Sequence, residues 1–162
     1  MRRYAGLIKN DFTDGNGICV SYWVQGCPHH CPGCHNPETW DFDGGLECPQ
    51  DLLKQIKEAI CANGIQRNFS ILGGEPLCPE NIGHVHALVC YIRDMFPDIK
   101  IFLWTGYTLE ELKEYSFARE ARAILDKIDV LIDGPYIEAK RDITLPLRGS
   151  SNQNILYKGK DF

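Results

Sequence analysis

The sequence predicts a single-domain α/β protein, a partial open (β/α) barrel of about five or six mostly parallel strands with helices on the outside. Three observations support this prediction. Short apolar segments alternate along the 162 residues with longer segments of helical period. The apolar segments are continuous runs, which is typical of parallel strands that are buried on both faces. The length of 162 residues predicts one domain, residues 1–162. Its strands number fewer than the eight that close a barrel, so we expect the barrel to have an open side.

The elements in the first two thirds of the chain follow from these patterns in order. Residues 18–24, ICVSYWV, are expected to form a buried strand that leads into a cluster of cysteines. Residues 49–63 are expected to form an amphipathic helix. Residues 68–74 should form a short strand that ends in two glycines, residues 79–96 the next helix, and residues 98–107 another strand. The apolar stripe of the first helix consists of Leu52, Leu53, Ile56, Ala59 and Ile60.

The last third of the chain continues the alternation. Residues 108–128 are expected to form one helix, which opens with Thr108 and Glu111 at the spacing of a capping box. Residues 129–136, DVLIDGPY, should form another internal strand, and residues 154–158, NILYK, a last one. The alternation of strands and helices favours a parallel sheet with right-handed crossovers.

Four motifs each follow a predicted strand: the cysteine cluster, GGEP, WTGY and DGPY. In parallel α/β sheets the working loops lie at the carboxyl ends of the strands. We therefore expect all four motifs to meet on one rim of the sheet.

Composition and charge exclude several classes of function. The net charge is −5 and the sequence has no block of lysine and arginine, so we expect no nucleic-acid partner. The longest uncharged apolar stretches, such as ALV and IFLW, are far shorter than the roughly 18 residues of a membrane span. The start, MRRYAGLIKNDF, has no apolar run after its arginines, so we expect no signal peptide, no membrane association and a cytoplasmic location.

Three of the eight cysteines lie close together in GCPHHCPGCHN. Cys27, Cys31 and Cys34 form a C-x3-C-x2-C pattern, whose thiolates converge only if the chain loops around a metal centre. Prolines and a glycine between them disfavour a helix that would point the thiols apart. In a reducing compartment such thiols act as metal ligands, as catalytic groups or as small buried side chains.

Spacing alone leaves three kinds of metal centre open. A zinc site needs four ligands, and His29, His30 or His35 could supply the fourth. An electron-transfer iron–sulfur cluster also takes four cysteines, and Cys48 could complete the set. The third candidate is a 4Fe–4S cluster held by three cysteines, with one iron open to another ligand. The remaining cysteines, Cys19, Cys61, Cys78 and Cys90, lie among apolar residues and are interpreted as small buried side chains.

Five segments, in this order, resemble the activating proteins of anaerobic ribonucleoside-triphosphate reductases, a family of radical S-adenosylmethionine (radical SAM) enzymes. The segments are NGICVSYWVQGCPHHCPGCHNPETW, ILGGEPL, FLWTGYTLEEL, DVLIDGPY and LRGSSNQ. The cysteine spacing and GGEP are typical of the superfamily. The other three segments, in a chain this short, are similar to those of the activating proteins. The resemblance covers nearly the whole chain.

The resemblance implies a cofactor set and a reaction. Cys27, Cys31 and Cys34 would bind one 4Fe–4S cluster, and the methionine part of SAM would bind the fourth iron. The reduced cluster of such enzymes cleaves SAM to methionine and a 5′-deoxyadenosyl radical, which abstracts a hydrogen atom from a glycine of the reductase. The cofactors carry the chemistry, and the protein positions and shields them. The implied partners are the large subunit of the reductase and a one-electron donor such as a flavodoxin.

The resemblance also implies where SAM binds. Gly73 and Gly74 have no side chain, so their backbone can approach the methionine part closely. Glu75 would anchor the loop or bind the amine. The hydroxyl of Thr105, at the end of the next strand, would meet the ribose or the carboxylate. The loop of residues 148–153 is either a further group of SAM contacts or a structural loop.

An aromatic residue often flanks the third cysteine in these relatives. Here the flanking residues are Gly33 and His35, and His35 is interpreted as the substitute. Trp104 is interpreted as a core residue rather than as a cofactor-stacking one. The predicted SAM-binding residues are Gly33, Cys34, His35, Gly73, Gly74, Glu75 and Thr105.

Two alternatives to the reductase-activating function stay open at this point. One is another small radical SAM enzyme, of the pyruvate formate-lyase activase or 7-carboxy-7-deazaguanine synthase type. The other is a non-enzymatic zinc or iron–sulfur module. The first predicts a different substrate. The second predicts a colourless zinc protein or a closed cluster that does not respond to SAM.

Overall fold

Four parallel strands form the centre of the sheet, where the continuous apolar runs of the sequence predicted them. The computed structural model describes residues 2–162. The parallel strands are β2 (Cys19–Val24), β4 (Asn68–Gly73), β5 (Ile101–Trp104) and β6 (Val130–Asp133). They lie side by side in this order, and β2 pairs with β4 so that Val24 is opposite Gly73. All four residues of β6 are buried, which explains the absence of polar alternation in its sequence.

Three antiparallel strands extend the sheet to a total of seven, with the order β3-β1-β2-β4-β5-β6-β7. They are β1 (Arg3–Asp11), β3 (Leu46–Glu47) and β7 (Asn154–Tyr157). The last strand was predicted, but it runs antiparallel to β6, and β1 and β3 were not predicted. Within residues 2–162, no pairing joins β3 to β7, so hydrogen bonds leave the sheet open. The α/β class is confirmed and a barrel is not.

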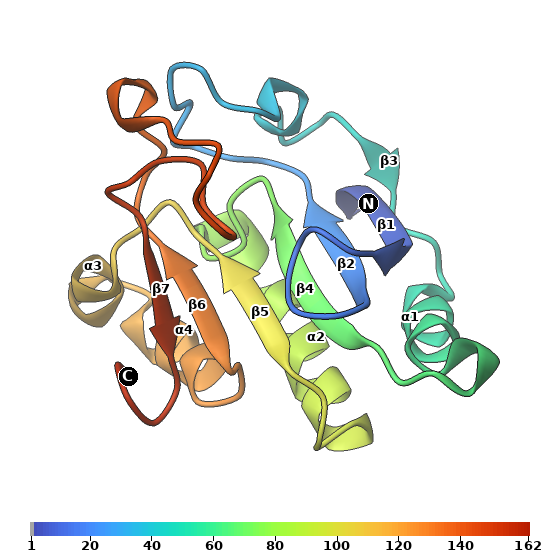
Figure 1. Cartoon of the computed structure of the whole chain (residues 1–162). Helices are drawn as coiled ribbons and strands as arrows, with labels where there is room; N and C mark the ends of the chain where they lie inside the picture. The colour runs from blue at the N-terminus through green and yellow to red at the C-terminus, as the bar shows by residue number, and fades with distance from the viewer. Residues whose placement is uncertain (1) are drawn as a thin grey trace.

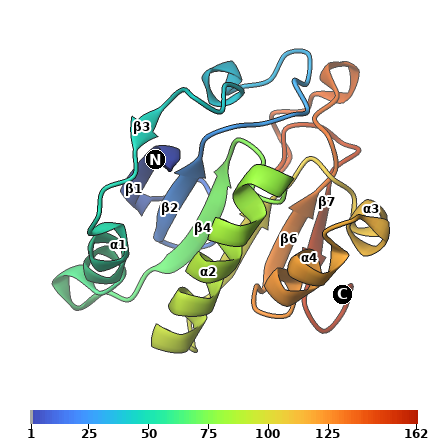
Figure 2. The same ribbon diagram turned by 180° about the vertical axis from the view of Figure 1, so that it is seen from behind.

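The helices that cover the sheet lie on one of its faces. They are α1 (Leu52–Ile60), α2 (Pro79–Met95) and α4 (Ala118–Leu125). Figure 2 shows α2 and α4 in front of the strands and α1 at the side of the sheet near β1 and β2. The opposite face, turned to the viewer in Figure 1, carries the loop after β1 instead of a helix. No helix within residues 2–162 is both long and apolar enough to cross a membrane.

The packing of α1 corrects two details of the sequence prediction. Ile56 and Ile60 of its apolar stripe are fully buried in the main core. Leu53, assigned to the same stripe, is 42% exposed. Cys61, interpreted as buried, is exposed, because it follows the last residue of α1 on the side away from the core. Cys19 and Cys78 are fully buried, as expected for small apolar side chains.

The single helix predicted for residues 108–128 is wrong, because the chain breaks it into two. The helix α3 (Leu109–Glu114) ends before Tyr115, whose backbone is extended at φ −67° and ψ 152°. The hydroxyl of Tyr115 lies 3.0 Å from that of Tyr107, and its ring packs on Phe117. These aromatic contacts hold Tyr115 out of helical geometry, and α4 begins only at Ala118. Side-chain contacts between nearby aromatic residues here outweigh the preference for helix.

Candidate functional site

A cleft of about 190 Å³ lies at the carboxyl ends of the parallel strands. In Figure 1 the arrowheads of β2, β4, β5 and β6 all point toward the same edge of the sheet. The cysteine cluster and the motifs GGEP, WTGY and DGPY all contribute to its wall, so the predicted rim is present. Among the residues that line the cleft are Cys27, Cys31, Cys34, Gly73, Gly74 and Glu75.

The cysteine loop owes its shape to tight local turns. The amide of Cys34 donates to the carbonyl of Cys31 at 3.0 Å, which closes a four-residue turn. Pro32 and Gly33 occupy the middle of this turn, and Gly33 has φ +77°, as a type II turn requires at that position. The turn holds the thiols of Cys31 and Cys34 on one short loop beside Cys27.

The thiols of this loop are half-buried, and the environment of Cys27 and Cys31 favours the protonated form. Burial raises the pKa of Cys27 from 9.0 to about 11, and the charge of Glu75 contributes further. Burial also raises the pKa of Cys31. A bound cation reverses this preference, because a metal-bound thiol loses its proton. Metal binding at these cysteines should therefore release protons.

The glycine loop lies directly against the cysteine loop. The amide of Gly74 donates to the carbonyl of Val24 at 2.8 Å, and the amide of Glu75 donates to the carbonyl of Gly26 at 2.9 Å. A Cβ atom on Gly74 would overlap with the carbonyl oxygen of Gly26, and Gly73 adopts φ +106°. Both positions therefore require glycine. The result is a bare strip of backbone that faces the thiols across the cleft.

Glu75 connects the loops of the site from inside the protein, where it is 1% exposed. Its Oε1 atom accepts hydrogen bonds from the Leu77 amide and the Thr105 hydroxyl, both at 2.8 Å. Its Oε2 atom accepts from the Gly106 amide at 2.7 Å and from His29 Nε2 at 2.8 Å. The carboxylate is thus occupied by the protein itself. This geometry favours the loop-anchoring role of Glu75 and leaves the Thr105 hydroxyl bonded to Glu75.

The histidines of the cysteine loop have partners that are not thiols. Burial alone would lower the pKa of His29, but the hydrogen bond to Glu75 and the charge of Glu75 outweigh it and raise this pKa above 6.5. The ring of His30 packs on Trp40, with 4.8 Å between the centroids. The ring of His35 lies 5.8 Å from that of Tyr136. Within residues 2–162 no three His, Cys, Asp or Glu side chains are grouped to hold a single metal ion.

Cys48, the candidate for a fourth cysteine ligand, lies in a different environment. Its Sγ atom is 3.6 Å from the hydroxyl of the fully buried Tyr22, and the same hydroxyl lies 2.9 Å from His84 Nε2. Cys48 is not part of the cleft wall formed by the other three cysteines. The geometry of the thiols therefore favours a set of three.

Tyr136 is a cleft residue that the sequence analysis missed. Its ring lines the cleft beside His35, and its hydroxyl donates to Glu138 at 2.7 Å. Glu138 in turn packs against Gly33, where any side chain would collide with it. The signal was present in the motif DGPY, because an aromatic ring at the carboxyl end of a parallel strand points to the rim. Tyr136 supplies an aromatic wall that Gly33 cannot.

The loop of residues 148–153 is held by its own hydrogen bonds. Arg148 donates to the carbonyl of Gln153 at 3.0 Å, and the Gln153 side chain accepts from the amide of Gly149 at 3.0 Å. Asn152 donates to the carbonyl of Pro135 at 2.7 Å. These contacts favour a structural role for this loop, although Gly149 and Gln153 also line the cleft.

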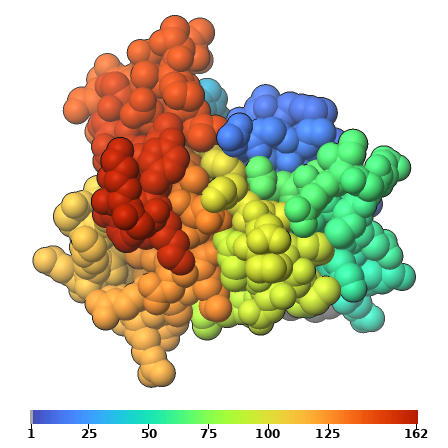
Figure 3. Space-filling view, turned by 60° about the horizontal axis from the view of Figure 1, so that its bottom comes forward, coloured from blue at the N-terminus to red at the C-terminus, as the bar shows by residue number. Residues whose placement is uncertain are grey.

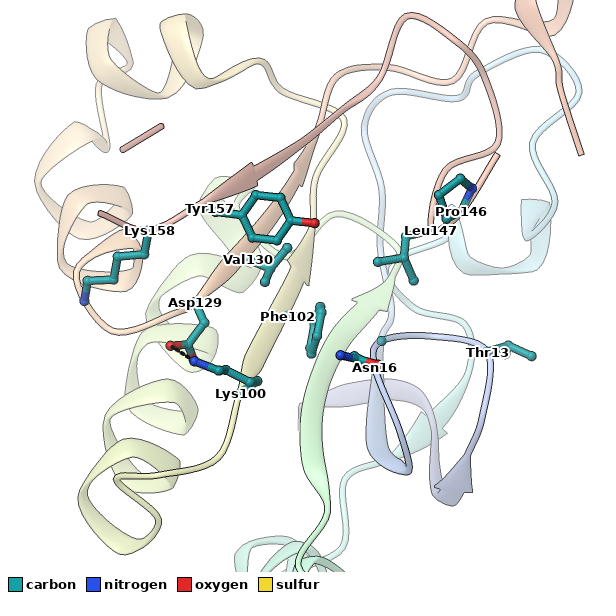
Figure 4. A pocket seen from close by; sticks show the side chains of 11 residues that line it. Thr13, Asn16, Lys100, Phe102, Asp129, Val130, Pro146, Leu147, Tyr157 and Lys158 are labelled. Carbon is teal, nitrogen blue, oxygen red and sulfur yellow. Dashed lines mark ion pairs between the residues drawn. The ribbon is translucent and has the colours of Figure 1, made fainter. Parts of the chain in front are cut away.

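A second, larger cavity of about 600 Å³ lies on the helix-free face of the sheet. Figure 4 shows Asn16, Phe102, Val130, Leu147 and Tyr157 around it. In Figure 3 the blue residues of the loop after β1 and the red residues near the C-terminus lie on either side of the yellow residues of β5.

Trp104 and Leu147 stand between the two cavities. Trp104 lines the cleft and stacks on Phe102, and its Nε1 atom donates to the carbonyl of Leu147 at 2.7 Å. Leu147 has φ +57°, which is an uncommon conformation for a residue with a side chain. The larger cavity therefore adjoins the cleft at this pair.

Three thiols on one loop, opposite a bare glycine backbone at the carboxyl edge of an open sheet, define an iron–sulfur protein of the α/β class. The donor set fits such a cluster, since the three thiols share one cleft and the histidines of the loop contact Glu75, Trp40 and Tyr136. Residues 13–156 match the family model described as a 4Fe-4S single cluster domain.

Similar proteins of known name identify the family more narrowly. The anaerobic ribonucleoside-triphosphate reductase-activating protein of Pasteurella multocida is 37% identical over 156 residues, which cover 96% of each chain. The protein of the same name from Vibrio cholerae is 38% identical over 90% of this chain and 91% of its own. That of enterobacteria phage T4 is 34% identical over 94% and 92%. The chain belongs to the family of anaerobic ribonucleoside-triphosphate reductase-activating proteins.

Proposed function

We propose that this protein is a radical SAM enzyme that generates a glycyl radical on an anaerobic ribonucleoside-triphosphate reductase. The observation that carries the proposal is the single cleft in which Cys27, Cys31 and Cys34 face the bare backbone of Gly73 and Gly74. The names of the relatives, which match over nearly their whole length, support the reductase as partner.

The three cysteines would hold a 4Fe–4S cluster, and the cleft beside them would hold SAM. When bound, such a cluster supplies an electron and an open iron site for the amine and carboxylate of SAM. Gly73 and Gly74 would place their peptide groups against the methionine part. Cys34, His35 and Thr105, which line the cleft, would form the remaining contacts, and Tyr136 would close the wall on the aromatic side. Gly33, the other predicted contact, packs against Glu138 and is not part of the cleft wall.

The larger cavity supports a protein as substrate. It opens on the face of the sheet that has no helix, and it meets the cleft at Trp104 and Leu147. An extended segment of the reductase could lie in it and bring a glycine to the cleft, excluding water as it docks. Glycine suits radical formation because it has no side chain in the way and its flanking amides stabilise a Cα radical. The electron would come from a small donor protein such as a flavodoxin, in the cytoplasm.

Anaerobic reconstitution with iron and sulfide tests the cofactor set. We expect a brown protein whose reduced electron paramagnetic resonance spectrum changes when SAM is added. Alanine at Cys27, Cys31 or Cys34 should abolish reductive cleavage of SAM, whereas Cys61→Ala, at an exposed cysteine, should not. Loss of the cluster in Cys48→Ala, together with a spectrum indifferent to SAM, would contradict the proposal in favour of a redox module with four ligands.

Detection of a glycyl radical on the reductase tests the proposed reaction. With the anaerobic reductase subunit present, reduction and SAM should produce a doublet resonance that narrows when the reductase carries glycine deuterated at Cα. Efficient turnover of a small molecule with no radical on the reductase would favour an enzyme of the 7-carboxy-7-deazaguanine synthase type instead.

A further inference from the structure

We propose that His29 is a positioning residue that holds the cysteine loop against the glycine loop through its hydrogen bond to Glu75, and that this contact sets the geometry in which SAM binds. The inference rests on the proposed function, and it assigns a role to a side chain between the first two cysteines. His29 is one of the three histidines that could complete a zinc site, but its contacts give it a different role.

The first step is the bond itself. His29 Nε2 lies 2.8 Å from Oε2 of Glu75, whose carboxylate is 1% exposed. The other bonds of this carboxylate come from Leu77 on the glycine loop and from Thr105 and Gly106 after β5. Glu75 is therefore fixed by two neighbouring parts of the rim. His29 brings the cysteine loop to the same fixed point.

The second step is the packing that orients the imidazole. A Cβ atom on Gly106 would lie 2.6 Å from Cδ2 of His29, so the ring rests directly on this backbone. The ring of Tyr107 meets it edge-on, with 4.6 Å between centroids. The hydroxyl of Tyr107 is itself placed by Tyr115 at 3.0 Å. Gly106 is thus needed for close approach, and the imidazole is held on both its face and its edge.

The third step concerns the place of His29 in the chain. It lies two residues after Cys27 and two before Cys31, so fixing its ring fixes the middle of the three-residue spacer. The backbone of the two loops is joined nearby by the bond from the Glu75 amide to the Gly26 carbonyl. Together these contacts set the distance between the thiols and the glycine backbone. A displacement of about 1 Å at a reacting site is enough to cost a large factor in rate.

If His29 positions the cysteine loop in this way, its replacement should weaken SAM binding without preventing cluster binding. All three cysteines remain when His29 is replaced, so the cluster should still assemble. SAM, which would touch both loops, should bind less well. The variant His29→Phe retains a flat ring on Gly106 but donates no hydrogen bond. The variant His29→Gln retains a donor that can reach Glu75. The control is His30→Asn, which removes an imidazole from the same loop at a φ of +47°, a conformation that asparagine tolerates.

The experiment measures iron and sulfide per chain and the dissociation constant of SAM by equilibrium dialysis in reconstituted proteins. We expect His29→Phe to retain the cluster and to bind SAM about tenfold more weakly, the effect of losing one buried bond to a carboxylate. We expect His29→Gln to recover most of the affinity and His30→Asn to match the wild type. The SAM-dependent change in the resonance spectrum should be smaller in His29→Phe than in His29→Gln.

Three outcomes would overturn the inference. Wild-type affinity for SAM in His29→Phe would show that the contact between His29 and Glu75 does not set the geometry of the SAM site. Loss of iron in both His29→Phe and His29→Gln would make His29 part of the cluster site or of the fold rather than a positioning residue. If the reconstituted wild type does not bind SAM, the proposed function fails, and this inference fails with it.

Discussion

Gly74 shows at the scale of one residue how the two loops of the cleft depend on each other. Its Cβ position is filled by the carbonyl oxygen of Gly26, which is backbone and cannot rotate away. We therefore expect Gly74→Ala to push the loops apart and to lower the free energy of unfolding by about 1–3 kcal/mol. The measurement is urea unfolding of the cluster-free protein, followed by tryptophan fluorescence.

The matched control is Gly83→Ala. A Cβ atom on Gly83, inside α2, would meet no atom within 4 Å. Alanine is a better helix former than glycine, so this variant should be as stable as the wild type or up to about 1 kcal/mol more stable. Equal effects of the two substitutions would contradict the close approach of the loops.

Asp11, the last residue of β1, and Asp14, in the turn that follows, make the stability of the protein depend on pH. Burial would raise the pKa of Asp11, but hydrogen bonds from Ser21 and Thr13 outweigh it and lower this pKa to about 2. Burial and the neighbouring Asp11 carboxylate raise the pKa of Asp14 from 3.8 to about 7. The folded chain therefore holds a proton on Asp14 that the unfolded chain has lost. Stability falls as the pH rises from about 4 through 7.

The variant Asp14→Asn tests this dependence. It removes the cost of an ionised carboxyl, so we expect it to be more stable than the wild type by about 1–2 kcal/mol at pH 8. The difference should vanish below about pH 3, where Asp14 is mostly protonated in both states. Asp98→Asn, at an exposed position, should keep the wild-type profile. A constant difference across the pH range would refute the assignment.

At the scale of elements, the short helix α3 depends on its first turn. The amide of Glu111 donates to the Thr108 hydroxyl at 3.2 Å, and the amide of Thr108 donates to the Glu111 carboxylate at 2.7 Å. Since α3 has only six residues, this predicted capping box contributes much of its stability. We expect Thr108→Ala to lower the free energy of unfolding by about 1 kcal/mol and Thr108→Ser to retain most of it. Thermal unfolding followed by circular dichroism measures both, and equal losses would contradict the cap.

The elements that the sequence predicted are those whose pattern is local. The parallel strands are apolar throughout, and α1 and α2 carry long periodic segments. By contrast, β1 is half exposed and β3 has two exposed residues, so neither has a local signal. They are strands because β1 pairs with β2 and β3 pairs with β1. The break at Tyr115 comes with a contact to Tyr107, eight residues earlier, which helical periodicity does not indicate.

At the scale of the whole molecule, topology made the rim predictable and left its internal bonds unpredictable. Parallel strands bring their carboxyl ends to one edge, so the four motifs had to meet there. The bond from His29 to Glu75, 46 residues apart, depends on how two irregular loops pack. Tyr136 belongs to one of these motifs, but its place beside His35 in the cleft follows from the path of the chain after β6.

The open face of the sheet yields the last prediction, which concerns the docking of the reductase. Asn16 is exposed in the loop after β1 and extends toward the larger cavity in Figure 4. Its carbonyl oxygen accepts a bond from Asn68, but within residues 2–162 its side chain has no recorded hydrogen bond. The variant Asn16→Trp should therefore fill the cavity without disturbing the fold or the cleft. If the reductase inserts a segment here, the affinity for it should fall about tenfold or more, because a buried contact is replaced by a steric overlap. The melting temperature and the affinity for SAM should stay those of the wild type.

Lys54→Trp, which adds the same bulk at an exposed position of α1, should bind the reductase normally. Equal binding of the reductase by both tryptophan variants would place the docking surface elsewhere than on the helix-free face.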